Sequence, residues 1–260
     1  MRIALGIEYD GQEFCGWQSQ KGDLPTVQAV LEAGLSTVAN SSVKVICAGR
    51  TDTGVHACGQ VVHFDTEVDR DERAWILGAN ANISKVISVV WAKPVSEKFH
   101  ARFSAVRRRY RYVIANRLVR PTFAAGRVSW EYRPLDEQRM QQATNHLLGE
   151  HDFNSYRTAA CQAHSPVRTI HRLEVTRKED LVIIDIEANA FLHHMVRNIA
   201  GVLMAIGAGE QAVDWSREVL DARDRTMGGV TAPPHGLYFM GVEYPPEFGI
   251  PQLPPTQLVW

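Results

Sequence analysis

One short segment of the chain brings a carboxylate and a guanidinium together between two glycines, with an imidazole two residues after the second glycine. It reads Gly49-Arg50-Thr51-Asp52-Thr53-Gly54-Val55-His56-Ala57. Glycine permits tight turns and close approach of the backbone to a ligand, and loops held by strands at both ends often carry catalytic groups. If the segment is extended, Arg50 and Asp52 face the same way, and the guanidinium would keep the carboxylate ionised. The pattern predicts a catalytic Asp52, and it is equally typical of an Asx-turn in a β-hairpin.

A second segment is rich in cations and aromatic rings. The stretch from Lys98 to Arg120 has eight cations and no Asp or Glu: Lys98, Arg102, Arg107, Arg108, Arg109, Arg111, Arg117 and Arg120. On a strand, Arg108, Tyr110 and Tyr112 would share one face. Interleaved basic and aromatic side chains suit phosphate contact and base stacking, so the segment predicts an RNA-binding surface. A sheet edge protected by cations, with two core tyrosines, has the same pattern.

A third segment, Phe191 to Asn198, is predicted to open a helix that continues to Ile206. His193 and Arg197 are four residues apart and would share a helix face away from the apolar residues. Cations beside a helix N-terminus can receive a phosphate or a carboxylate. The alternative is that these polar residues simply face solvent.

Composition places the chain among soluble globular proteins. Its 260 residues carry a formal net charge of -1, with 45% hydrophobic and 22% charged residues, which allows one large domain or two modest ones. No apolar stretch approaches the roughly 18 residues of a membrane span, and the N-terminal apolar run predicts a strand, not a signal peptide. Four cysteines without a C-x-x-C pair indicate reduced thiols in the cytosol.

Several cofactor and metal motifs are missing from the sequence. It has no Walker A sequence, no G-x-S-x-G, no H-E-x-x-H, and none of the spacing of zinc nucleobase deaminases. Gly207-Ala208-Gly209 follows a predicted helix, so it indicates a helix C-cap and not a dinucleotide loop. We therefore expect no metal and no cofactor, and any chemistry must come from carboxylate, tyrosine and cations.

The predicted strands and helices alternate irregularly, which favours an α+β fold with a mainly antiparallel sheet. Thr26 and Asp136 are predicted to begin helices, and Gly149 to end the second of these. We expect an N-terminal α+β half over residues 1–104, a C-terminal α+β half over 105–245, and a Pro-rich tail over 246–260. The expected strands cover about 2–9, 43–47, 61–64, 87–91, 106–116, 169–177, 181–189 and 237–243.

Taken together, these segments resemble the TruA family of tRNA pseudouridine synthases along nearly the whole chain. Six ordered motifs carry the resemblance. They are D-G-x-x-F-x-G-W-Q from Asp10, G-R-T-D-A-G-V-H-A from Gly49, F-H-A-R-F-S-A from Phe99, G-x-H-D-F from Gly149, F-L-H-H-M-V-R from Phe191, and A-P-P-x-G-L from Ala232. One departure is Thr53, where the family usually has Ala; we expect altered tuning and not lost activity.

The resemblance implies that the protein isomerises uridine to pseudouridine at positions 38, 39 and 40 of the tRNA anticodon stem-loop. It implies a pseudouridine synthase fold of two similar halves that share a mainly antiparallel sheet and flank a basic cleft. It further implies a cytoplasmic homodimer that binds one tRNA with both subunits and needs no cofactor.

The resemblance also assigns roles to single residues. Asp52 would be the essential carboxylate, Tyr110 would stack on the uracil and help remove the C5 proton, and Arg197 would pair with Asp52. The side chains of Arg50, Arg102, Arg108 and His193 would contact the substrate. A non-catalytic tRNA-binding protein or chaperone would explain the basic, aromatic strand equally well. A uridine methyltransferase is a further alternative, but no cofactor-binding glycine loop supports it.

Overall fold

The chain folds into two compact units in a computed structural model that describes residues 1–20, 22 and 24–251. One unit comprises Met1–Val106 with the described residues from Tyr238 onward, and the other comprises Arg107–Leu237. The sequence predicts a single half over residues 105–245. Strand β10 (Leu237–Glu243) departs from that expectation, because Tyr238 and Phe239 pair with strand β3 (His56–Asp65) of the N-terminal unit.

The predicted Pro-rich tail can be followed only in part. Pro246–Phe248 forms a short 3-10 turn that is followed by Gly249 in the left-handed region, at φ 55°. The remaining residues of the predicted arm, 252–260, lie outside the described residues.

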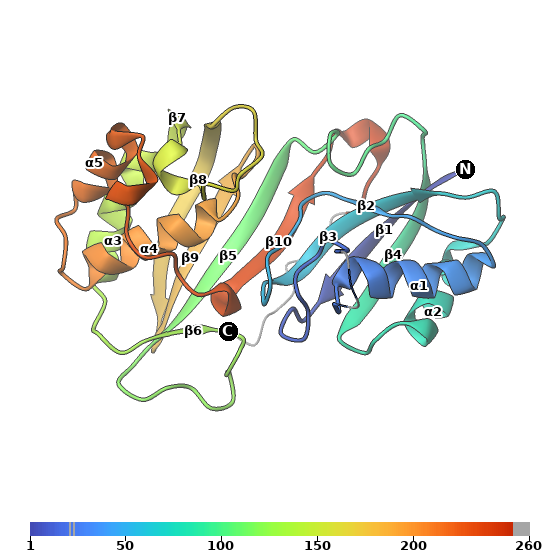
Figure 1. The fold of residues 1–260 in the computed structure, drawn as a ribbon, viewed down its shortest axis with the longest axis horizontal. Helices are drawn as coiled ribbons and strands as arrows, with labels where there is room; N and C mark the ends of the chain where they lie inside the picture. The colour runs from blue at the N-terminus through green and yellow to red at the C-terminus, as the bar shows by residue number, and fades with distance from the viewer. Residues whose placement is uncertain (21, 23, 252–260) are drawn as a thin grey trace. The chain divides into compact units, whose positions relative to one another are not determined.

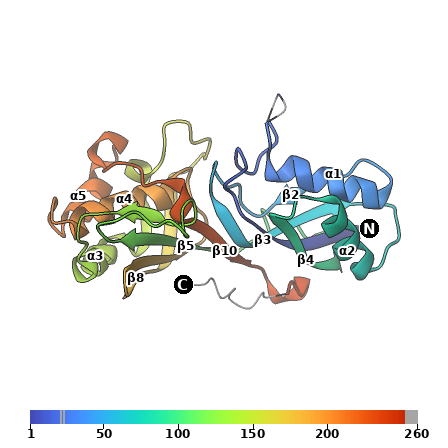
Figure 2. The same cartoon turned by 90° about the horizontal axis from the view of Figure 1, so that it is seen from below.

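The N-terminal unit is a sheet with two helices (Figures 1 and 2). Its strand order is β4 (Ile87–Val95), β1 (Arg2–Tyr9), β3 and β10, and the short β2 (Ile46–Cys47) also pairs with β3. β1 is antiparallel to both of its neighbours, whereas β10 runs parallel to β3. Helices α1 (Val27–Ala39) and α2 (Glu72–Asn82) pack against each other, and α2 also contacts β4.

Strand β3 is buried on both faces, and adjacent residues show what covers each one. The ring of Phe64 lies 5.0 Å from that of Trp75 on α2. Because successive side chains of a strand point to opposite faces, His63 points the other way, where its ring lies 4.9 Å from that of His100. Phe99, beside His100, is fully buried. One face of β3 therefore meets the helices, and the other meets the turn that follows β4.

The C-terminal unit is also a mainly antiparallel sheet with helices packed on it (Figure 1). Its strand order is β5 (Arg107–Asn116), β9 (Leu181–Ala188), β8 (Val167–Lys178) and β7 (Gly149–Asp152), and β6 (Ser129–Glu131) pairs in parallel with β5. Helix α3 (Glu137–Thr144) contacts β8 and α4 (Met195–Gly207), and α5 (Trp215–Ala222) contacts α3. The mainly antiparallel α+β class predicted from the sequence is confirmed.

The predicted N-cap at Thr26 and the predicted helix start near Asp136 are both confirmed. The hydroxyl of Thr26 accepts a hydrogen bond from Ala29 N at the start of α1, and the carboxylate of Asp136 accepts from Gln138 N and Arg139 N at the start of α3. The predicted end at Gly149 is wrong. Helix α3 stops at Thr144, and Gly149, at φ 89°, begins β7.

None of the helices found in residues 1–20, 22 and 24–251 combines the length and the apolar character that crossing a bilayer requires.

Candidate active site

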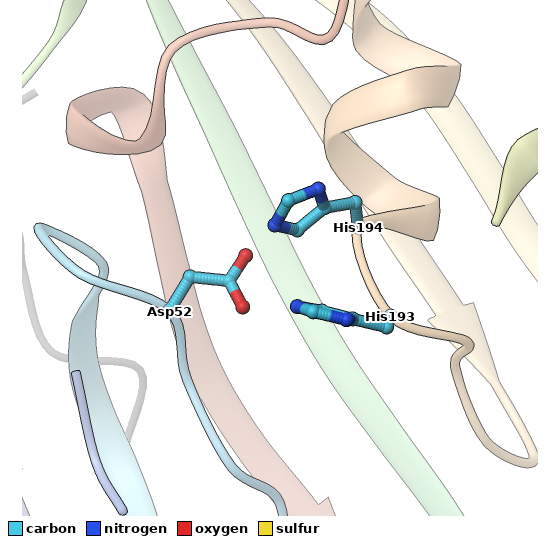
Figure 3. Close-up of side chains that lie close together, drawn as sticks. All are labelled: Asp52, His193 and His194. Atoms are coloured by element: carbon cyan, nitrogen blue, oxygen red, sulfur yellow. The ribbon is translucent and has the colours of Figure 1, made fainter. Parts of the chain in front are cut away.

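The loop that carries Asp52 runs between β2 and β3 of the N-terminal unit (Figure 3). Val55 N donates a hydrogen bond to the main-chain carbonyl of Asp52 at 3.2 Å, which closes a turn with Gly54 at φ 77°. This main-chain turn lies where the sequence predicts an Asx-turn as the alternative. Asp52 is half-buried, and Thr53, the residue that departs from the family motif, is exposed.

Three hydrogen bonds, one of them fully buried, hold the loop to the sheet. The Tyr9 hydroxyl, at the end of β1, lies 2.7 Å from the hydroxyl of Thr51. Gln60 on β3 bonds Gly49 twice, since its Nε2 donates to the Gly49 carbonyl at 2.6 Å and its Oε1 accepts from Gly49 N at 3.3 Å. The residues before Asp52 are therefore anchored to strands, and the chain after it enters β3 at His56; such anchoring is what precise placement of a side chain requires.

A second loop, which follows β1, packs directly against the Asp52 loop. Trp17 N donates to the Thr51 carbonyl at 3.0 Å. Gly11 N donates to Nδ1 of His56 at 3.1 Å, and a Cβ on Gly11 would lie only 2.0 Å from the carbonyl oxygen of Val55. The loop with the D-G-x-x-F-x-G-W-Q motif and the Asp52 loop are thus packed against each other.

The glycine at position 16 serves the same contact between the two loops. Its φ is 86°, and a Cβ there would lie 2.8 Å from the Thr51 carbonyl oxygen. The sequence patterns did not assign Gly11, Gly16 or Trp17 a role in supporting the Asp52 loop. The glycines of D-G-x-x-F-x-G-W-Q are the signal that could have found them, because such glycines often mark close backbone approach.

Neither buried thiol near the Asp52 loop is suited to nucleophilic chemistry. Cys47, at the end of β2, is buried, and burial raises the pKa of its thiol to about 12. A thiol with so high a pKa carries almost no thiolate at neutral pH, and the thiolate is the nucleophile. Cys58 on β3 is buried as well. The carboxylate of Asp52 is the better candidate in this unit.

The two arginines predicted to contact substrate in the N-terminal unit are both exposed. Arg50 precedes Thr51 in the Asp52 loop, and Arg102 lies in the turn after β4 with its guanidinium carbon 5.5 Å from the ring centre of Phe103.

The aromatic face predicted for strand β5 is present in the C-terminal unit. Tyr110 is half-buried, and its ring meets that of Phe191 edge-on at 4.9 Å. Arg108 Nη1, on the same face, donates to the Asn189 carbonyl at 2.8 Å. Tyr112 is fully buried, and its hydroxyl donates to the Pro233 carbonyl at 2.8 Å. The strand therefore changes from core at Tyr112 to accessible surface at Arg108.

Acidic residues of β9 and of the turn before it neutralise part of the basic stretch, which the sequence did not predict. Arg111 makes two hydrogen bonds with the Asp185 carboxylate, at 2.8 and 2.9 Å. Two further pairs are Arg107 with Glu187 at 3.2 Å and Arg117 with Asp180 at 3.1 Å. Arg107 and Arg111 lie on the β5 face opposite Tyr110, so the expectation that the whole stretch serves phosphate contact needs correction.

The start of helix α4 corrects the prediction for His193. The helix begins at Met195, and His194 before it has φ 64°, in the left-handed region. His193 therefore lies in the preceding turn and does not share a helix face with Arg197. The rings of His193 and His194 lie 4.3 Å apart, and Figure 3 shows both at the start of α4.

Arg197 is held on the first turn of α4 by the segment before β10. Its Nε donates to the Ala232 carbonyl at 2.9 Å, and Ala232 N donates back to the Arg197 carbonyl at 3.1 Å. The next residue, Pro233, accepts the Tyr112 hydroxyl. Arg197 is thus hydrogen-bonded to the A-P-P motif through both its side chain and its main chain.

A polar network that the sequence did not predict holds the segment before β10 against α4. Arg225 Nη2 donates to Asn198 Oδ1 at 3.1 Å, to the Gly229 carbonyl at 3.0 Å and to the Thr231 hydroxyl at 2.9 Å. The Thr231 hydroxyl also donates to Asn198 Oδ1 at 2.7 Å. Because Thr231 adjoins Ala232, the network determines where the carbonyl that orients Arg197 lies.

Each unit therefore presents one group of residues with catalytic potential: a supported carboxylate loop in the first, and a half-buried tyrosine with an oriented arginine in the second. The sequence profile of a family described as tRNA pseudouridine synthase matches residues 6–104 and 143–245. The chain belongs to this family. Its members are isomerases that convert uridine to pseudouridine in tRNA.

Curated relatives of the same family match the chain along almost its full length. A tRNA pseudouridine synthase A of Nitrosococcus oceani is 60% identical over 260 residues, which is 100% of both chains. One of Legionella pneumophila is 58% identical and covers 99% of this chain and 98% of the relative. One of Pseudomonas aeruginosa is 57% identical and covers 96% and 88%. The family resemblance inferred from the six motifs is confirmed.

Proposed function

We propose that this protein isomerises uridine to pseudouridine at positions 38, 39 and 40 of the tRNA anticodon stem-loop, and that Asp52 is its catalytic carboxylate. The observation that carries the proposal is the Asp52 loop, whose flanking residues are tied to β1, β3 and the loop after β1. The near-complete match to curated synthases at 57–60% identity supports the reaction class.

The reaction is balanced within one nucleotide and needs no other reactant. The N1–C1′ bond breaks, the uracil turns, and a C5–C1′ bond forms; C5 then loses its proton and N1 gains one. The target base must leave its stack before this chemistry, at a cost of a few kcal/mol. We therefore expect no cofactor, and the residues must bind, turn and deprotonate the base.

Two roles suit the Asp52 carboxylate. It would attack a carbon of the nucleotide as a nucleophile, or it would remove a sugar proton as a base. Loss of N1 by elimination removes the proton of the adjacent sugar carbon, C2′. Deuterium at C2′ should therefore slow the reaction several-fold if Asp52 is the base, and leave the rate nearly unchanged if it is the nucleophile.

Tyr110 is proposed to stack on the turned uracil and to help remove the C5 proton. Its half-buried position and its edge-on contact with Phe191 leave the ring oriented, as a stacking partner must be. Tyr110→Phe keeps the ring and removes the hydroxyl, so release of the C5 proton should slow while tRNA affinity is kept. An unchanged rate would remove the proton-transfer role.

Arg197 is proposed to pair with Asp52 and to help hold the turned nucleotide. Because its Nε is engaged by the Ala232 carbonyl, the pairing would use the terminal Nη groups. Arg197→Lys keeps the charge and loses the fork geometry, so turnover should fall. The side chains of Arg50, Arg102, Arg108 and His193 are proposed to contact the RNA.

The test of the central assignment is release of tritium from tRNA that carries 5-tritiated uridine. Asp52→Asn should abolish release while tRNA affinity stays nearly unchanged. The matched control is Asp69→Asn, the same change at an exposed carboxylate, which should retain full activity. Persistent tritium release by Asp52→Asn would refute the assignment.

The target positions and the rival function are tested by one further experiment. Incubation of the wild-type protein with unmodified tRNA, followed by carbodiimide mapping, should find pseudouridine at positions 38 to 40. Modification at other uridines would overturn the proposed specificity, and tRNA binding without any pseudouridine would favour a non-catalytic binding protein. We also propose a cytoplasmic homodimer, which sedimentation of the purified protein and fractionation of cells would test.

A further inference from the structure

The turn that follows β4 holds a phenylalanine ring in solvent. Phe103 is 76% exposed, whereas Phe99 on the same turn is fully buried. Single exposed apolar residues are common on protein surfaces, so exposure alone assigns no site. Two neighbours distinguish this ring: the His100 imidazole stacks on it with centroids 4.4 Å apart and planes at 28°, and the Arg102 guanidinium lies 5.5 Å from its centre.

Hydrogen bonds within the turn fix the His100 ring beneath Phe103. His100 Nδ1 accepts from Arg102 N at 3.2 Å and from Phe103 N at 3.1 Å. Ser104 closes the other side, because its N donates to the His100 carbonyl at 2.9 Å and its hydroxyl accepts from His100 N at 3.0 Å. Since Nδ1 accepts these bonds, the imidazole is neutral and can stack without a charge.

The turn is also anchored to the core from two directions. Ala101 is fully buried, and its N donates to Nδ1 of His63 on β3 at 3.1 Å. Its carbonyl accepts from the hydroxyl of Tyr244, after β10, at 2.6 Å. An exposed ring on so rigid a support loses little conformational freedom when it binds a partner, which favours binding.

We propose that the stacked His100–Phe103 pair is a platform for an unpaired nucleobase of the RNA substrate, with Arg102 as its cationic neighbour. Every base has a π-face, and aromatic rings beside cations are the usual means of holding single-stranded nucleic acid. The inference rests on the proposed function for the identity of the RNA.

The surroundings of the platform favour RNA over a protein partner. The charged residues of the stretch from Lys98 to Val106 are Lys98 and Arg102, with no acid among them, which suits a phosphate backbone. One ring on a tight turn is also far smaller than the apolar centre of a stable protein interface.

The experiment measures the affinity of the full-length protein for an unmodified tRNA transcript by filter binding. Phe103→Ala should raise Kd by roughly 5- to 150-fold, the range found when one stacked base loses its aromatic partner. Phe103→Leu, which keeps apolar bulk without a ring, should lose nearly as much, while Phe103→Trp should bind like wild type. Leu77→Ala, an exposed apolar residue on α2, is the matched control and should have no effect.

Salt separates stacking from phosphate contact. The fold-change caused by Phe103→Ala should be the same at low and high salt, whereas Arg102→Ala should reduce the slope of log Kd against log salt by about one. Wild-type affinity of both Phe103→Ala and Phe103→Leu would overturn the platform.

The platform and the proposed function fail in different ways. If the wild-type protein forms pseudouridine but the ring variants bind tRNA normally, only the platform is wrong. If the ring variants weaken RNA binding but the wild-type protein forms no pseudouridine, the platform stands and the proposed function is wrong.

Discussion

The hydroxyl pair between Tyr9 and Thr51 offers the sharpest test of how the sheet positions Asp52. Both side chains are buried, at 4% and 8% exposure, and the two oxygens lie 2.7 Å apart. Tyr9→Phe removes one hydroxyl and leaves the other buried, which costs about 1 to 3 kcal/mol of stability. Thr51→Val should cost a similar amount, because it leaves the Tyr9 hydroxyl buried without this partner.

A double-mutant cycle isolates the contact. The combined Tyr9→Phe and Thr51→Val variant removes both hydroxyls and nearly keeps their shapes, so it should cost less than the sum of the two single changes. We expect a coupling energy of about 1 to 2 kcal/mol in urea unfolding. Tyr132→Phe, at an exposed tyrosine, is the matched control and should be neutral.

The same variants should affect catalysis, since Thr51 adjoins Asp52. If about 1.4 kcal/mol of the lost positioning energy appears in the transition state, single-turnover tritium release slows about tenfold. tRNA affinity should change little. A coupling energy of zero, or wild-type turnover in all three variants, would refute the view that β1 positions the Asp52 loop through this contact.

Three further predictions test other supports. Gly11→Ala places a Cβ 2.0 Å from the Val55 carbonyl oxygen, so it should cost about 1 to 3 kcal/mol and slow turnover; wild-type melting and turnover would contradict this. Arg225→Met removes two hydrogen bonds to the segment that carries Ala232 and one to Asn198 on α4, so kcat should fall more than KM changes, and partial rescue by Arg225→Lys is expected. Burial lowers the pKa of His63 from 6.5 to about 4, so as the pH falls the unfolded chain binds the proton before the folded protein does. The folded state is therefore fully stable with respect to this group above about pH 6.5, and it loses about 3 kcal/mol of stability as the pH drops to 4. His63→Asn should reduce this loss in urea titrations.

Local sequence signals predicted the parts of the fold that depend on neighbours in the chain. The caps at Thr26 and Asp136 need only a side-chain oxygen a few residues before free N–H groups, and both are present. The start of α4 was misplaced at Phe191 for the opposite reason. The helical spacing of apolar residues extends back through the turn before α4 and so predicts too early a start. His194 has a left-handed conformation, which does not continue an α-helix, and the helix therefore begins only at Met195.

The type and order of the candidate site residues follow from the sequence. Asp52 lies between glycines, Tyr110 lies on a basic strand and Arg197 lies in a later motif, and these motifs identify the family. Their individual catalytic roles stay proposals.

The tertiary structure alone decided what supports these residues and which cations are neutralised. Arg111 meets Asp185 because β5 and β9 pair in one register, 74 residues apart in sequence. Thr51 meets Tyr9 because β1 lies beside β3. Such contacts join residues far apart in the chain, and no local pattern encodes them. The sequence by itself therefore determined which groups are present for chemistry, and strand register and loop packing determined which groups hold them in place.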